Sequence, residues 1–176
     1  MMDINKTSIY APFIACLVTG FMLTLPIASF GKEDSKKEVG TSVPLLGNDH
    51  IASPGSPHIP YNSDPPTSGP HTQYIAPWGI HNTPVLKEMQ VHNLEDGGVM
   101  IQYNCSNCNE MIKKLEGLAS QYKQIILAPY PGLGSMIALT AWGKIDKLKE
   151  YDEKRITRFV NAYIGIDHHP QSEKQP

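Results

Sequence analysis

The chain has 176 residues, with 15 basic and 17 acidic side chains and a formal net charge of −2 at pH 7. Nucleic-acid binding requires a concentrated basic surface, whereas the lysines here are scattered over the C-terminal half. This excludes nucleic acid as the main partner. The length that remains after an N-terminal segment is set aside suits a single domain.

Residues 1–31 have the pattern of an export signal. Lys6 precedes a long apolar run, and Ser29 and Gly31 are small residues suited to cleavage after Gly31. The run is also about long enough to span a bilayer, so an uncleaved anchor is the alternative. We expect a periplasmic or extracellular protein, held at the inner membrane only through this segment if it is retained.

Two further segments precede the regular structure. Residues 32–53 are charged and then rich in glycine, serine and proline, which predicts a flexible arm. Residues 54–84 carry repeated prolines, which exclude regular helix and central strand. Because Tyr61, Tyr74 and Trp78 are interspersed, this stretch is predicted to be an ordered loop layer that packs onto a scaffold.

Periodicity predicts the remaining elements. Strands are predicted at residues 99–103, 124–128 and 135–142, and helices at 107–122 and from Asp152 to Gly165. A turn sequence at residues 129–132 suggests that the second and third strands are antiparallel partners. The result is an α+β fold for one domain over residues 54–170, followed by a disordered tail at 171–176. It combines a small, mainly antiparallel sheet with two helices and the long proline-rich loop layer.

Several histidines in these loops are candidate metal ligands, because imidazole is the commonest protein ligand for transition metals. His71 ends a proline-stiffened loop, which lowers the entropy lost in holding an imidazole still. The alternative is a local cap of the loop. His58 lies between two prolines and is a weaker candidate, while His50 and His81 are interpreted as surface residues.

His92 and Glu95 are three residues apart, so on a helical turn they share a face and can point into one site. The alternative is a purely structural histidine–carboxylate pair. His168 and His169 are adjacent, and neighbours in extended chain point to opposite sides. We therefore expect one inward and one solvated histidine, with Asp167 orienting the inward ring.

Sulfur-containing residues add two hypotheses. Met89 lies just before His92, and thioether with imidazole ligation favours copper, with zinc as the second choice. Cys105 and Cys108 follow a predicted strand and open a helix. A structural disulfide, a redox dithiol and a soft-metal site are all compatible with this spacing.

Five motifs together resemble a bacterial protein family classed as a domain of unknown function, DUF3105. They are residues 61–71 (YNSDPPTSGPH), 76–79 (APWG), 91–99 (VHNLEDGGV), 138–143 (ALTAWG) and 167–170 (DHHP). The resemblance covers roughly residues 57–170 and implies an exported or membrane-tethered protein, with no established activity. The family usually has a second histidine where this chain has Asp96, which would supply a harder oxygen donor to a metal.

The leading functional hypothesis is an exported transition-metal-binding protein. Its ligands would be His71, His92 and one of His168 and His169, supplemented by Glu95 or Met89. One alternative is an enzyme, either a metal-assisted hydrolase or a dithiol redox protein. Another is an envelope interaction module that binds a protein partner and uses its histidines for packing. The residues do not identify a reaction.

Overall fold

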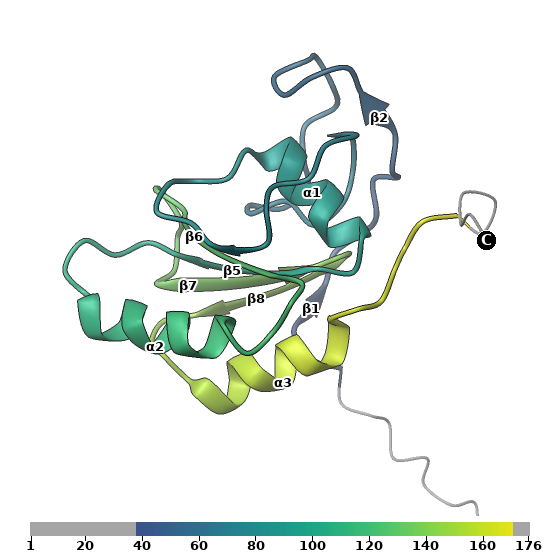
Figure 1. Ribbon diagram of the computed structural model, residues 1–176. Coiled ribbons are helices and arrows are strands. Elements are labelled where there is room, and N and C mark those ends of the chain that lie inside the picture. The colour runs from purple at the N-terminus through teal and green to yellow at the C-terminus, as the bar shows by residue number, and fades with distance from the viewer. Residues whose placement is uncertain (1–37, 171–176) are drawn as a thin grey trace, which may run out of the picture. The chain divides into compact units, whose positions relative to one another are not determined.

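The computed structural model describes residues 38–170, and within them six strands form the main sheet in the order β1-β8-β7-β5-β6-β4 (Figure 1). The strands are β1 (Thr41–Ser42), β4 (Gly79–Ile80), β5 (Val99–Tyr103), β6 (Ile125–Pro129), β7 (Ile137–Ala141) and β8 (Lys144–Leu148). The pairings β1–β8, β8–β7 and β7–β5 are antiparallel, whereas β5–β6 and β6–β4 are parallel. The predicted α+β fold with a mainly antiparallel sheet is confirmed.

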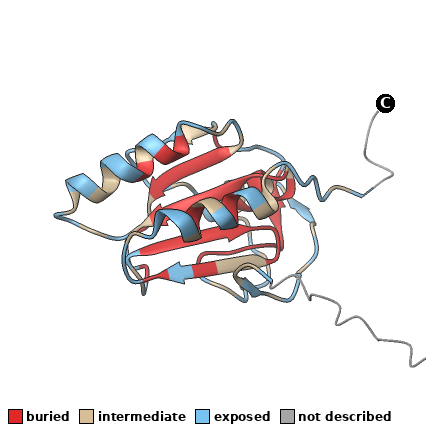
Figure 2. Cartoon of the chain, turned by 90° about the horizontal axis from the view of Figure 1, so that it is seen from below, coloured by how far each residue is buried: buried red, intermediate tan, exposed pale blue. Residues whose placement is uncertain are grey.

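Helices cover both faces of this sheet (Figure 1). Helices α2 (Asn109–Ala119) and α3 (Glu153–Tyr163) pack on one face, and α1 (Lys87–Glu95) lies on the other with the proline-rich loops. Side chains of β5 alternate between the two cores, as the two-residue period of a strand requires. Val99 and Ile101 face α2 and α3, and Met100 faces α1. Figure 2 shows the central strands of the sheet buried, strand β8 partly exposed, and helices whose outer faces are exposed.

The two predicted helices form where their apolar residues recur at helical spacing. In α2, Leu115, Leu118 and Ala119 are buried. In α3 the Asp152 carboxylate accepts a hydrogen bond from the Arg155 amide at 3.0 Å and so caps the helix. These predictions are confirmed to within a few residues at each end.

One predicted strand pairing is wrong. Strands β6 and β7 are not neighbours, because β5 lies between them, parallel to β6 and antiparallel to β7. Helix α2 connects β5 to β6 and supplies the crossover that a parallel pair needs. The segment after β6 therefore carries the chain past β5, and β7 forms its hairpin with β8 instead.

Part of the predicted flexible arm belongs to the sheets. Within residues 32–53, β1 pairs with β8, and β2 (His50–Ile51) pairs in parallel with β3 (His71–Thr72). Backbone pairing holds this segment although its composition resembles a linker. The predicted export segment at 1–31 and tail at 171–176 lie outside the described residues. Among residues 38–170 we find no helix that is long and apolar enough to cross a membrane.

Helix α1 was not among the predicted helices, because it lacks an apolar stripe. Val91 and Leu94 are buried, but so are Gln90, Asn93 and Glu95. The loops cover α1, and its buried polar side chains bind them. The Asn93 amide, for example, accepts from the Ala76 amide at 2.8 Å and donates to the Ala76 carbonyl at 2.9 Å. The helix therefore serves as a polar anchor for the loop layer.

Candidate metal centre

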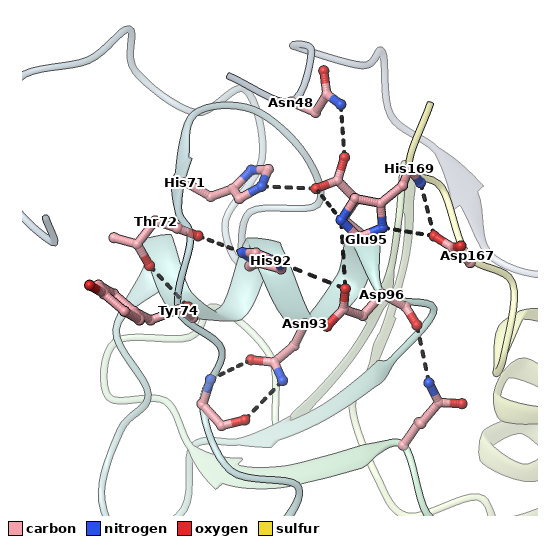
Figure 3. A network of polar contacts seen from close by, with 12 residues as sticks. Asn48, His71, Thr72, Tyr74, His92, Asn93, Glu95, Asp96, Asp167 and His169 are labelled. Carbon is pink, nitrogen blue, oxygen red and sulfur yellow. Dashed lines mark hydrogen bonds and ion pairs between the residues drawn. The ribbon is translucent and has the colours of Figure 1, made fainter. Parts of the chain in front are cut away.

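Three segments bring histidines to the C-terminal end of α1 (Figure 3). Helix α1 carries His92 and Glu95 and is followed directly by Asp96. The loop strand β3 supplies His71, and the chain beyond α3 supplies His169. The convergence expected from the sequence is therefore present for these residues.

The three imidazoles share one hydrogen-bond pattern: the Nδ1 atom of each lies against an oxygen that accepts only. The pairs are His71 Nδ1 with Gly69 O at 2.8 Å, His92 Nδ1 with Thr72 O at 2.6 Å and His169 Nδ1 with Asp167 Oδ1 at 2.8 Å. Each Nδ1 therefore carries its proton and donates it, which leaves Nε2 as the atom directed at the centre. This is the arrangement in which protein histidines usually bind metals.

The Nε2 atoms meet two adjacent carboxylates. Glu95 Oε2 lies 2.9 Å from His71 Nε2 and 3.5 Å from His169 Nε2. Asp96 Oδ1 lies 3.7 Å from His92 Nε2 and 3.8 Å from His169 Nε2. Donor atoms that share one metal ion at bonds of about 2.0–2.2 Å lie roughly 2.9–3.5 Å apart. The distances around Glu95 already match this range, and those around Asp96 are slightly longer.

The His71–Glu95 contact is the most buried part of the centre. The two side chains are 0% and 1% exposed. Although His71 Nε2 and Glu95 Oε2 are 2.9 Å apart, they are not aligned as a hydrogen bond, so both count as buried polar atoms without a hydrogen-bond partner. The other carboxylate oxygen, Oε1, accepts from Asn48 Nδ2 at 2.9 Å. A cation bound to both atoms would satisfy them.

Electrostatics at the centre favour a cation. Burial acts to raise the pKa of Glu95, but the adjacent His71, the Asn48 amide and the nearby His169 lower it overall. Burial likewise acts to lower the pKa of His169, yet its bond to Asp167 and the charge of Glu95 raise it overall. Burial raises the pKa of Asp96, against the opposing effect of the nearby histidines. The Glu95 carboxylate is therefore ionised although it is buried, and it offers a negative charge to a cation.

The ligand atoms fall into two overlapping groups. His92, Glu95 and His169 form one group, and His50, His71 and His92 form the other. Within each group the ligand atoms lie within 4.8 Å of one another. His92 belongs to both, so it stands at the middle of the centre.

Gly97 lets the C-terminal chain approach the end of α1 and deliver His169. Its φ is +82°, and a Cβ atom there would lie 2.8 Å from backbone atoms of Ile166. The Gly165 amide donates to the Gly97 carbonyl at 2.7 Å, and the His168 amide donates to the Glu95 carbonyl at 2.8 Å. These contacts fix the course of the chain just before the third imidazole.

We expect Gly97→Ala to lower the free energy of unfolding by about 2 kcal/mol, because it combines a left-handed backbone with a clash. Metal affinity should fall with it, since His169 is displaced. Gly117→Ala is the matched control: this exposed glycine lies inside α2, where a Cβ meets nothing within 4 Å. The free energy of unfolding of this control should rise by roughly 0.5–1 kcal/mol. Urea unfolding of both variants checks the difference, and equal effects would contradict it.

Other residues singled out in the sequence lie elsewhere. His58 Nδ1 contacts the Ile59 carbonyl at 2.7 Å, and its Nε2 is 3.9 Å from Glu88. His168 is exposed, and its ring stacks near Trp142 with centroids 6.0 Å apart. Thus His169 is the inward member of the histidine pair, oriented by Asp167.

The sulfur-containing residues also lie apart from this group. Met89 packs with the core under α1. Cys105 and Cys108 form a disulfide just before α2, which is compatible with both a structural disulfide and the oxidised form of a redox dithiol.

Sequence reasoning missed two members of the centre, His50 and Asn48. Both come from the segment interpreted as a flexible arm, and neither lies in a motif that indicates a ligand. The sequence holds no local signal for either residue, because the pairing of β2 with β3 is what brings both of them to the centre.

The fold and the histidine–carboxylate cluster define a small α+β protein with a candidate metal centre. The chain matches the family described as "Protein of unknown function (DUF3105)" over residues 54–176, and it belongs to that family. The matched region includes His71, His92, Glu95 and His169 but begins after His50. No curated protein and no solved structure gives a significant match.

Proposed function

We propose that this protein binds one transition-metal ion through His71, His92, His169 and Glu95. The observation that carries the proposal is the hydrogen-bond pattern that the three imidazoles share. Each donates its Nδ1 proton to an oxygen, and each directs Nε2 toward the Glu95–Asp96 carboxylates. A structural role for the histidines would not require the same nitrogen of all three to face two adjacent carboxylates.

Copper is the first metal of the proposal and zinc the second. The packing of Met89 in the core removes the thioether argument for copper. The remaining donors are imidazole nitrogens and a carboxylate, which suit both Cu²⁺ and Zn²⁺. Copper still ranks first, because divalent copper binds such donors more tightly than zinc does. The aspartate at position 96, where the family usually has histidine, adds negative charge beside the ion.

An exported location is part of the same proposal. The Cys105–Cys108 disulfide is compatible with an oxidising compartment. A protein that carries, buffers or senses metal ions in the cell envelope needs a metal centre of this kind but no substrate cleft. Metal-assisted hydrolysis remains the alternative use of the same ligands, with Glu95 as the acid–base group.

The test is a titration of the untagged full chain, first stripped with a chelator, with Cu²⁺ or Zn²⁺. We expect one ion per chain. At free metal about 100 times the dissociation constant, stability should rise by about 2.7 kcal/mol, which corresponds to a melting temperature roughly 8 °C higher. Adding the chelator back should reverse the shift. Binding that is weak, of variable stoichiometry and without a thermal shift would reject the metal function.

A further inference from the structure

The segment of residues 46–51 runs along the loop that carries His71. The Gly69 amide donates to the Gly47 carbonyl, and the His71 amide donates to the Asp49 carbonyl, each at 3.0 Å. The parallel pairing of β2 with β3 places His50 opposite His71 in register. We call residues 46–51 the strap. It precedes the region matched by the family.

Two strap side chains reach the candidate centre. The Asn48 amide donates to Glu95 Oε1 at 2.9 Å. The ring of His50 lies edge-on to that of His71, with centroids 4.9 Å apart, and stacks against that of His92 at 5.4 Å. Ligand atoms of these three histidines lie within 4.8 Å of one another. The strap thus supplies an imidazole to the same cluster that the rest of the chain builds.

Little buried apolar surface holds the strap in place. Gly47, Asp49 and His50 are exposed, and the pairing with β3 is only two residues long. A segment with few buried apolar contacts and solvent-facing backbone hydrogen bonds opens easily. A metal–imidazole bond would therefore change the stability of this segment more than that of the core.

We propose that His50 is an additional ligand of the bound ion, so that metal binding closes the strap over the centre. This inference rests on the proposed metal function. His92 has only Nε2 available, since its Nδ1 donates to the Thr72 carbonyl. It can therefore serve one ion at a time, and an ion that it shares with His71 would also have the His50 imidazole within reach. The strap is then the exposed, exchangeable side of the centre, through which the ion enters and leaves.

The experiment compares the full chain with His50→Ala, using Zn²⁺ as the probe. Affinity is measured by competition with a chromophoric chelator, and closure by hydrogen exchange of peptides covering residues 45–53, with and without zinc. His50 is exposed, so the variant keeps the fold. His58→Ala is the matched control, because it removes a histidine that lies outside the cluster.

We expect His50→Ala to bind zinc at least about tenfold more weakly, as loss of a supporting group at a metal site typically does. Zinc should slow exchange of the strap in the wild type and in His58→Ala but not in His50→Ala. If the wild type binds zinc and either of these differences is missing, His50 is not a ligand, while the proposed function stands. If the wild type binds no zinc, the proposed function and this inference fall together.

Discussion

The His92→Ala variant is expected to bind Zn²⁺ and Cu²⁺ at least about 100-fold more weakly than the wild type. His92 is the imidazole shared by both groups of candidate ligands, so its loss cannot be bypassed by a shift of the ion from one group to the other. Mutations of groups that merely orient a ligand already cost 10–100-fold in metal affinity. Removal of the shared ligand should cost at least the upper end of that range.

The apo fold should tolerate this change, which keeps the measurement interpretable. The His92 side chain is 12% exposed, and its polar contacts are the Thr72 carbonyl and the carboxylate of Asp96 at 3.7 Å. Its ring otherwise lies beside other imidazoles of the cluster. His168→Ala is the control, because it removes the adjacent imidazole, whose ring stacks near that of Trp142 and which belongs to neither group of candidate ligands. It should bind metal like the wild type. Equal affinities for His92→Ala and His168→Ala, measured by chelator competition, would show that the bound metal sits elsewhere.

The sequence predicted those elements whose burial follows a simple period. Strand β5 is a short apolar run buried on both faces, and helices α2 and α3 each carry an apolar stripe, so the sequence pattern identifies them. Helix α1 was not predicted, because loops cover it and its buried face includes the polar residues Gln90 and Asn93. The partner of β6 was misassigned because a local turn signal says nothing about a third strand, β5, entering between two strands.

The candidate site was predictable to the extent that each ligand has a local signal. His71 follows a rigid loop, His92 and Glu95 are three residues apart on a helix, and the alternation of an extended chain separates His169 from its neighbour. His50 has no such signal. Its position depends on backbone pairing between two-residue strands more than twenty residues apart in sequence, β2 and β3, and such pairing carries little side-chain pattern.

The His71→Ala variant is expected to lower the free energy of unfolding of the metal-free protein by about 3 kcal/mol. His71 faces Glu95 at 2.9 Å, and the two side chains are 0% and 1% exposed. Removal of the imidazole leaves Glu95 Oε2 without its nearest polar neighbour, and an unsatisfied buried charged group costs about 1–3 kcal/mol or more. Loss of the hydrogen bond to the Gly69 carbonyl adds to the effect. Urea unfolding in the presence of a chelator measures it.

The double variant His71→Ala/Glu95→Gln separates the charge from the packing. If the uncompensated carboxylate causes the instability, neutralising Glu95 should restore part of the lost stability, because glutamine keeps the shape and still accepts from Asn48. The double variant would then be more stable than His71→Ala alone, although neither should bind metal tightly. If the two substitutions simply add, His71 acts as a packing residue and the pair has no electrostatic role. A buried pair that is costly to break in the absence of metal is what a preorganised centre requires, since the fold then holds the ligand atoms together before the ion arrives.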